Sequence, residues 1–278
     1  EENRVSPESD PNCFLFSRFL TSRISGSILQ SVPRTPRPTC PGLIFHAFNR
    51  GNGRQCVFPD KEDYLAFLAA LGSLKSRRPF RLYGYCLMPN HVHLLIQPVD
   101  TTISRILQSL LTSHSIRYHR RRGTCGHVWQ GRFKSPVIQG EAHILRVLRY
   151  IEANPVRAGL VRTPEEYAWS SYAVHALGKH DPLVDPLGEY DEMGDSPQAR
   201  QEAWRRYVNE DAMPDELTAI RRSATSGLPY GDAAWVERVL LEAGIPLSPH
   251  GRGRPPKIVR PKGPSQDAAP EDRDASGK

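Results

Sequence analysis

The sequence predicts an α+β fold with the split βαβ, ferredoxin-like plan, followed by further helices. Three observations support this prediction. Strand and helix patterns alternate in the order β-α-β-β-α-β from residue 43 onward. Two strand patterns in the middle of that series are separated only by Pro89-Asn90, which predicts a tight hairpin. A further helical pattern follows the last strand and runs up to Pro155, a residue that ends helices.

The first half of the pattern is a strand, a turn and a helix. Residues 43–52 (LIFHAFNRGN) predict a strand that ends in a glycine-rich turn at Gly51 to Gly53. Residues 60–77 place Tyr64, Leu65, Leu68 and Leu71 at helical spacing, and Asp60 is the expected N-cap.

The second half begins with the hairpin, whose strands are predicted at 80–88 (FRLYGYCLM) and 91–98 (HVHLLIQP). Residues 101–119 predict an amphipathic helix. Residues 134–139 predict a fourth strand, and residues 141–154 predict a helix that Pro155 stops.

The 278-residue chain is expected to have four parts. Residues 1–40 mix Ser, Pro and Arg without periodicity and predict a poorly ordered extension. Residues 41–178 contain the patterned domain. Residues 179–246 begin with a linker-like stretch, rich in Gly, Pro and Asp up to residue 196, and continue into helices predicted at 197–209 and 233–243. Residues 247–278 predict a disordered basic tail with an acidic end.

Composition favours a polyanionic partner, because the formal net charge is +7. Nucleic acid is the first choice, and an anionic membrane surface is the second. No apolar run approaches the length that crosses a membrane. The five cysteines form no CxxC pair, so we expect neither a disulfide framework nor a zinc knuckle, and a reducing cytoplasm fits.

Two histidines are the first candidate functional residues. His91 and His93 are two apart in a predicted strand, so both imidazoles project from one face. Val92, Leu94 and Ile96 then face the core on the other side. Two neutral imidazoles on a rigid strand make half of a divalent-metal site. The alternative is a pair of ordinary polar residues on a half-exposed strand.

A tyrosine on the last helix is the second candidate. Tyr150 and Asn154 are four apart and share a helix face with His143 and Arg146. Such a tyrosine is often a core residue with a hydrogen-bonded hydroxyl. If it packs across the face that bears His91 and His93, it becomes a nucleophile beside a metal. Asn154 could then add a carbonyl ligand for Mg²⁺ or Mn²⁺.

Basic residues concentrate between residues 101 and 140, where no Asp or Glu occurs. The seven are Arg105, Arg117, Arg120, Arg121, Arg122, Arg132 and Lys134. This run suits a phosphate backbone, although a solvated basic face is the alternative. Trp129 and Phe133 either stack on flipped bases or belong to the core, and we expect Arg132 to touch DNA.

The tail contains Gly251-Arg252-Gly253-Arg254-Pro255, which matches the core of an AT-hook. In that reading Arg252 and Arg254 enter a narrow minor groove. A merely flexible basic tail is the equal alternative.

Several motifs together resemble a known family. YGYCLMPNHVHLLI is followed by VWQGRFKS, RYIEANPVRAGLV and YAWSSY, and FHAFNRGNGRQCVF precedes them. This series resembles the single-tyrosine HUH transposases, or IS200-like transposases, and within them the REP-associated tyrosine transposases. The resemblance covers about residues 43–172 and extends more weakly into the C-terminal helices.

The resemblance implies metal-assisted chemistry on single-stranded DNA by a cytoplasmic bacterial enzyme. The family's paired histidines fall on His91 and His93, its nucleophile on Tyr150, and a metal-ligating polar residue on Asn154. The tyrosine would attack a phosphodiester at the foot of a DNA hairpin or repeat, with Mg²⁺ or Mn²⁺, and form a 5′-phosphotyrosine bond. Relatives can trade the tyrosine helix between subunits, so monomer and homodimer both remain open.

The predicted DNA-binding residues are Arg50, Arg54, Arg117, Arg120, Arg121, Arg132, Lys134, Arg252 and Arg254. Two alternative functions remain. One is a non-catalytic DNA-binding regulator on the same scaffold. The other is a metal-dependent hydrolase of small phosphoesters, which would leave no protein–DNA adduct.

Overall fold

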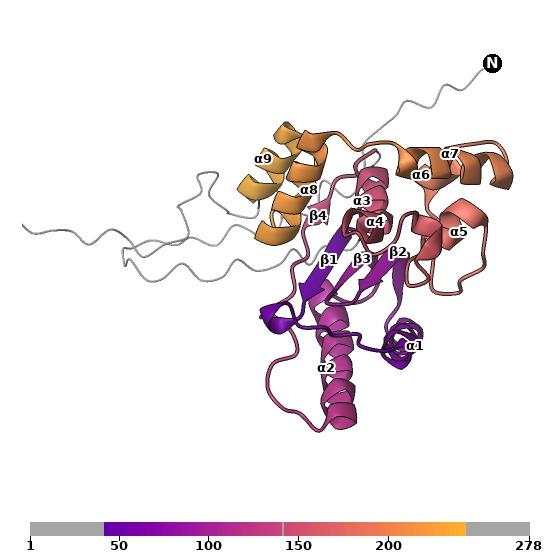
Figure 1. The fold of residues 1–278 in the computed structure, drawn as a ribbon. Helices are drawn as coiled ribbons and strands as arrows, with labels where there is room; N and C mark the ends of the chain where they lie inside the picture. Colours follow the sequence, from indigo (N-terminus) through magenta and orange to yellow (C-terminus); the bar gives the residue numbers. More distant parts are fainter. Residues whose placement is uncertain (1–41, 141, 243–278) are drawn as a thin grey trace, which may run out of the picture. The chain divides into compact units, whose positions relative to one another are not determined.

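A four-stranded antiparallel sheet forms the centre of the computed structural model, which describes residues 42–140 and 142–242 (Figure 1). Its strands are β1 (Ile44–Arg50), β2 (Phe80–Met88), β3 (His91–Pro98) and β4 (Val137–Ile138). Their order in the sheet is β2-β3-β1-β4. With one helix between β1 and β2 and another between β3 and β4, this is the ferredoxin-like plan. The predicted fold class is therefore confirmed.

Two helices, α1 (Lys61–Arg77) and α2 (Ile103–Arg122), cover one face of the sheet. Each begins at a residue whose side chain accepts a backbone hydrogen bond, Asp60 for α1 and Thr102 for α2. The predicted N-cap Asp60 is thus confirmed. Gly123 ends α2 with φ 60°, the left-handed conformation that glycine adopts without strain.

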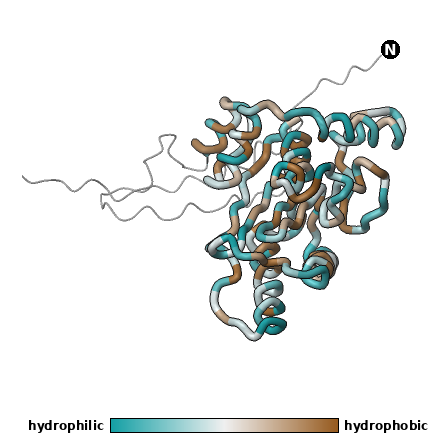
Figure 2. The backbone as a smooth tube through the Cα atoms, in the orientation of Figure 1, coloured by the Kyte–Doolittle hydropathy of each residue, from teal (hydrophilic) through white to brown (hydrophobic). Residues whose placement is uncertain are grey.

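The opposite face is covered by α3 (Ala142–Glu152), which packs its buried apolar side against β2 and β3. The approach is close at Gly84, where an added Cβ would lie 2.2 Å from a methyl carbon of Leu148. Only glycine allows that distance. Because both faces are covered, the central strands are hydrophobic along much of their length, and outer helices such as α7 are hydrophilic (Figure 2).

Shorter elements and further helices complete the described residues. They are η3 (Asn52–Arg54), α4 (Asn154–Arg157), η4 (Pro164–Glu166), α5 (Tyr172–Leu177), α6 (Gly188–Asp191), α7 (Pro197–Asn209), α8 (Pro214–Ser226) and α9 (Ala233–Glu242). The helices predicted at 197–209 and from residue 233 are confirmed. Helix α8 was not predicted from the sequence. The proposed boundary at residue 179 remains a prediction.

The stretch predicted as a linker, residues 179–196, is instead folded onto the domain. The backbone N–H of Asp185 donates to the carbonyl of Leu82 on β2. The Asp185 carboxylate accepts hydrogen bonds from the backbone N–H of Leu82 and from Lys75, the latter at 2.6 Å. Upstream, Ser171 likewise bonds the backbone of Tyr85. These contacts satisfy the free edge of β2, which would otherwise expose unpaired backbone groups.

A buried carboxylate joins α3 to the later helices. Glu152 is fully buried and accepts hydrogen bonds from Ser171 at 2.5 Å and from Nε1 of Trp204 at 2.8 Å, and its Oε1 lies 2.7 Å from Nδ1 of His175. Because a buried carboxylate is costly without partners, these contacts fix α3 against α5 and α7.

Two predicted elements differ from the structure. The fourth strand was predicted at 134–139, but the ladder of β4 is confined to Val137–Ile138, because Pro136 has no N–H to donate. The helix predicted to end at Asn154 ends at Glu152. Pro155, which was predicted to stop that helix, lies in the first turn of the next short helix, α4.

Some predictions concern residues that the structure does not describe. The N-terminal extension at 1–40 and the AT-hook-like residues Arg252 and Arg254 lie outside the described ranges. Within those ranges, no helix has both the length and the apolar character needed to cross a membrane.

Burial of His114 on α2 makes stability depend on pH. Its Nε2 lies 2.9 Å from the carbonyl oxygen of Val57, and burial lowers the pKa of His114 to about 4. The unfolded chain therefore binds more protons between about pH 6.5 and pH 4. The stabilisation is fully present above pH 6.5 and is lost as the pH falls.

We expect His114→Gln to weaken this pH dependence, because glutamine can still donate to Val57 but does not titrate. Between about pH 7 and pH 5, the wild type should lose about 2 kcal/mol more unfolding free energy than the variant. Urea denaturation at both pH values measures the difference. Equal losses in the two proteins would show that His114 is not the responsible group.

Candidate functional site

The site begins with the alternation of side chains along β1 and β3. The two strands pair so that Phe48 lies opposite His93 and Arg50 lies opposite His91. Both predicted histidines therefore project from the face covered by α3, while Val92, Leu94 and Ile96 are buried against α1 and α2. The side-chain directions expected for this strand are confirmed.

A third histidine, His46 on β1, completes the group. Its Nε2 lies 2.9 Å from Nδ1 of His93, and both side chains are buried, at 1% and 2% exposure. Nδ1 of His91 lies 2.6 Å from Oδ1 of Asn90, and the His91 and His93 rings are 5.0 Å apart. The sequence analysis did not identify His46. It lies two residues before Phe48 and therefore projects from the same face of β1 as Phe48.

All three imidazoles favour the neutral form. Burial lowers the pKa of His46 to about 3 and, with a smaller contribution from Arg50, that of His91 to about 4. The pKa of His93 lies well below its ordinary value, first because of burial and then because of neighbouring basic groups. A neutral imidazole keeps a nitrogen lone pair, which metal binding requires.

Tyr150 lies beside this group. Its ring centroid is 5.7 Å from that of His93 and 5.8 Å from that of His46. The Arg157 guanidinium carbon is 4.4 Å from the centre of the same tyrosine ring. The half-buried Tyr150 therefore does not point into the core away from the histidines.

Asn154 lies one turn further along, as the first residue of α4. Its side chain is half-buried and makes no hydrogen bond to any described residue. Among described residues, no three His, Cys, Asp or Glu side chains cluster as a metal site. A metal site built on His91 and His93 would therefore need further oxygen ligands, from the Asn154 amide or from a bound molecule. The metal-binding roles of His91, His93 and Asn154 remain predictions.

An open pocket of about 570 Å³ lies at His91, lined also by Asn90, Arg50 and Arg54. Two predicted DNA-binding arginines thus lie in the same pocket as one of the paired histidines. Arg54 adopts φ 63°, a left-handed conformation that is uncommon outside glycine and is often found at functional sites.

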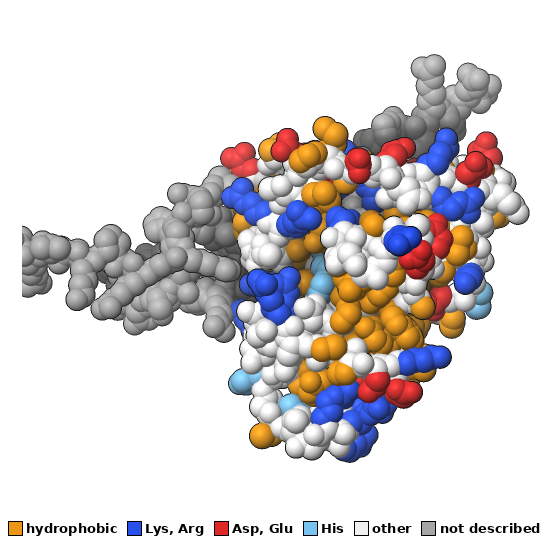
Figure 3. All heavy atoms as spheres, in the orientation of Figure 1, with side chains coloured by type: hydrophobic (Ala, Val, Ile, Leu, Met, Phe, Trp, Pro, Cys, Tyr) orange, Lys and Arg blue, Asp and Glu red, His pale blue; other side chains and the backbone are white. Residues whose placement is uncertain are grey.

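Arg121, whose DNA-binding role remains a prediction, pairs with acidic residues at the start of α1. It contacts Asp60 at 2.9 Å and the fully buried Asp63 at 3.0 Å, and Arg122 bonds the same two carboxylates. Figure 3 shows basic and acidic side chains side by side near the end of α2. The stretch 101–140 has no acid of its own, but α1 supplies the counter-charges.

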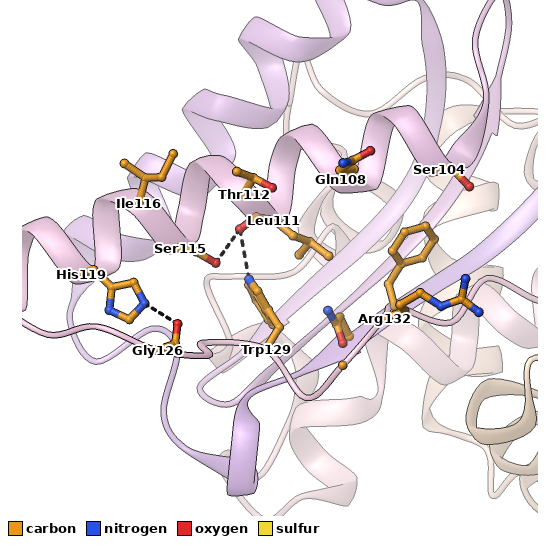
Figure 4. A pocket seen from close by; sticks show the side chains of 13 residues that line it. Ser104, Gln108, Leu111, Thr112, Ser115, Ile116, His119, Gly126, Trp129 and Arg132 are labelled. Atoms are coloured by element: carbon orange, nitrogen blue, oxygen red, sulfur yellow. Dashed lines mark hydrogen bonds between the residues drawn. The ribbon is translucent and has the colours of Figure 1, made fainter.

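Arg132 does not line the His91 pocket. It lines a second pocket of about 530 Å³ between α2 and the segment that precedes β4, together with Asn49 and Gln108 (Figure 4). Trp129 and Phe133 are buried there, and Nε1 of Trp129 donates to the carbonyl of Leu111 at 3.1 Å. Both aromatic residues therefore belong to the core.

The other predicted DNA-binding residues are spread over two elements. Arg117 and Arg120 lie on α2, where Arg120 is exposed and the buried Nε of Arg117 has no hydrogen-bond partner among the described residues. Lys134 pairs through its backbone with Phe48, next to the histidine group. The DNA-binding roles of all three residues remain predictions.

Comparison with known families shows which class of protein the sheet domain resembles. Residues 39–154 match the family model described as transposase IS200-like. This part of the chain is therefore similar to the IS200-like transposases, which confirms the resemblance found in the motifs.

Among individual proteins, the chain is similar to one from Haemophilus influenzae named “Putative REP-associated tyrosine transposase”. The two are 27% identical over 122 residues, which cover 40% of this chain and 69% of the relative. A solved structure of a REP-associated tyrosine transposase bound to a REP hairpin is 19% identical and has a TM-score of 0.45. That match covers 56% of this chain and 98% of the solved chain.

The ion pairs of Arg121 lead to a testable difference between two neighbouring arginines. We expect Arg121→Gln to lower the melting temperature and to leave affinity for single-stranded hairpin DNA unchanged, because its charge is already paired. Arg120→Gln, the matched control on the exposed face, should leave the melting temperature unchanged. Thermal unfolding and fluorescence-anisotropy titration measure both properties. Weakened DNA binding by a stable Arg121→Gln protein would show that Arg121 contacts the DNA despite its ion pairs.

Proposed function

We propose that this chain is a single-strand DNA transesterase that cuts and rejoins DNA at hairpin or repeat ends. The observation that carries the proposal is the position of the Tyr150 ring, 5.7 Å from His93 within a group of neutral histidines. The match of residues 39–154 to the IS200-like transposase model supports DNA strand transfer. The name of the Haemophilus influenzae relative supports a tyrosine as the nucleophile.

The proposed step exchanges one phosphodiester for another. The phenolic oxygen of Tyr150 bonds to phosphorus as the bond from phosphorus to the 3′-oxygen of the DNA breaks. The phenolic proton is released, and the departing 3′-oxygen takes up a proton. The 5′-phosphate stays on Tyr150 until a 3′-hydroxyl of another strand reverses the exchange. Water is not the nucleophile, so the energy of the bond is kept for rejoining.

The residues present fit a divalent cation such as Mg²⁺ or Mn²⁺. Asn90 accepts a hydrogen bond through its side-chain oxygen, so His91 must donate from Nδ1 and keeps a lone pair on Nε2. With His93 donating from Nδ1 to His46, its Nε2 is free in the same way. His91, His93 and Asn154 would hold the cation. When bound, it would polarise the phosphate and stabilise the leaving oxygen.

Arg50 and Arg54 are the proposed contacts to the DNA backbone nearest to the chemistry. Both line the pocket of His91, and the guanidinium carbon of Arg50 lies 5.6 Å from the ring centre of Phe48. Arginine forms paired hydrogen bonds to phosphate oxygens, so these residues suit a strand entering the pocket. We place the reaction in the bacterial cytoplasm, where Cys56, Cys86 and Cys125 would remain free thiols.

A covalent adduct is the decisive test of the reaction. Incubation of the protein with labelled hairpin-bearing single-stranded DNA and Mn²⁺ should give a labelled protein band on a denaturing gel. Tyr150→Phe should give no such band, because it lacks the attacking oxygen. Tyr118→Phe, on α2, is the matched control and should behave like the wild type.

Three other outcomes contradict the proposal. Cleavage by Tyr150→Phe removes Tyr150 as nucleophile. DNA binding by the wild type without any cleavage supports a non-catalytic regulator. Cleavage of phosphoesters without a protein–DNA adduct supports a hydrolase.

Metal binding can be tested separately, by calorimetric titration of the protein with Mn²⁺. We expect His91→Ala to abolish binding. His46→Gln should weaken it by about 10- to 100-fold, because His46 orients the ring of His93. His127→Gln changes an exposed histidine and should leave the affinity unchanged. Full Mn²⁺ affinity in His91→Ala would place the metal elsewhere.

A further inference from the structure

Arg157 folds back over the ring of Tyr150 from the short helix α4. Its guanidinium carbon is 4.4 Å from the ring centre, and its Nη2 donates a hydrogen bond to the backbone oxygen of Tyr150. One side chain therefore contacts both the ring and the main chain of the proposed nucleophile. The link from α3 through Ala153 into α4 brings it there, since Ala153 keeps a helical conformation.

The charges around Arg157 are unusual for a half-buried arginine. Two other arginines of this region share one acid from α8: Arg149 contacts Glu216 at 2.5 Å and Arg146 contacts it at 3.6 Å. Arg157 has no carboxylate partner among the described residues. Burial lowers the pKa of Arg157 to about 10, and the nearby Arg221 and Arg149 add to that effect.

A purely structural role explains the contacts but not the charge. The stacking on Tyr150 and the bond to its backbone oxygen would help to close the turn between α3 and α4. A neutral side chain could fill this space without the cost of an uncompensated, partly desolvated cation. An arginine without a counter-charge, placed on the ring of a nucleophile, is suited to receive an anion from outside the protein.

We propose that Arg157 is the positioning residue of the Tyr150 nucleophile and that its guanidinium supplies the counter-charge for the phosphate that becomes joined to Tyr150. This inference rests on the proposed function. The stacked ring is held towards His93 before attack, and the phosphate oxygens meet a positive charge that the protein leaves unpaired. The same contact would hold the 5′-phosphotyrosine until rejoining.

The test compares Arg157→Gln with Arg157→Lys in single-turnover cleavage of hairpin DNA. We expect the glutamine variant to cleave about 100-fold more slowly, a loss typical of removing one charge-stabilising donor. Its DNA affinity should stay close to that of the wild type, because Arg157 acts in the reacting state. Lysine keeps the charge and should recover at least about one tenth of the wild-type rate. Arg146→Gln, which removes an arginine already paired with Glu216, should cleave normally.

Thermal unfolding of each variant separates a chemical role from a structural one. The proposal would be overturned if the cleavage rate fell in proportion to the melting temperature, and did so to the same extent in the lysine and glutamine variants. If Arg157→Gln does not fold, Arg157→Met replaces it, because methionine keeps the aliphatic stem and removes the charge. Its cleavage rate should be as low as the rate expected for Arg157→Gln. Wild-type-like cleavage by any stable neutral variant would also refute it. A wild-type protein that forms no adduct would instead refute the proposed function, before Arg157 is tested.

Discussion

The antiparallel pairing of β1 with β3 is the constraint on which the candidate site depends. These are the two central strands, and both faces of the sheet are covered by helices. A shift of one residue would turn His91 and His93 towards α1 and α2 and turn Val92 and Leu94 the other way. Burial of the apolar set thus fixes the histidines, and the opposition of Phe48 to His93 brings His46 within hydrogen-bond distance.

Charge is arranged differently around the site and away from it. Carboxylates from distant segments pair with arginines at the end of α2 and along α3, through Asp60, Asp63 and Glu216. In the His91 pocket the lining charges are Arg50 and Arg54, and no acid lines it. With the nearby histidines neutral, positive potential there comes from arginines alone, an arrangement that favours anionic ligands.

The sequence alone was enough to predict the local parts of this structure. The hairpin strands were placed correctly because their alternation and the Pro89-Asn90 turn lie within twenty residues. His46 was missed because its partner is 47 residues away, and the ion pair of Arg121 was not foreseen because Asp60 is 61 residues away. Helix α8 carried signals, with Pro214 at its start and Gly227 at its end, but its exposed, largely polar face obscured them.

The anchoring of α3 also sets an order in which the chain can acquire its native contacts during synthesis. The carboxylate of Glu152 receives its partner Trp204 only after another 52 residues have been made, and Arg149 meets Glu216 later still. Contacts so distant along the chain form late because long loops must close first. The helix that carries Tyr150 therefore gains these supports only after α7 and α8 have been made, so a ribosome-bound fragment ending before α7 would present this helix without them.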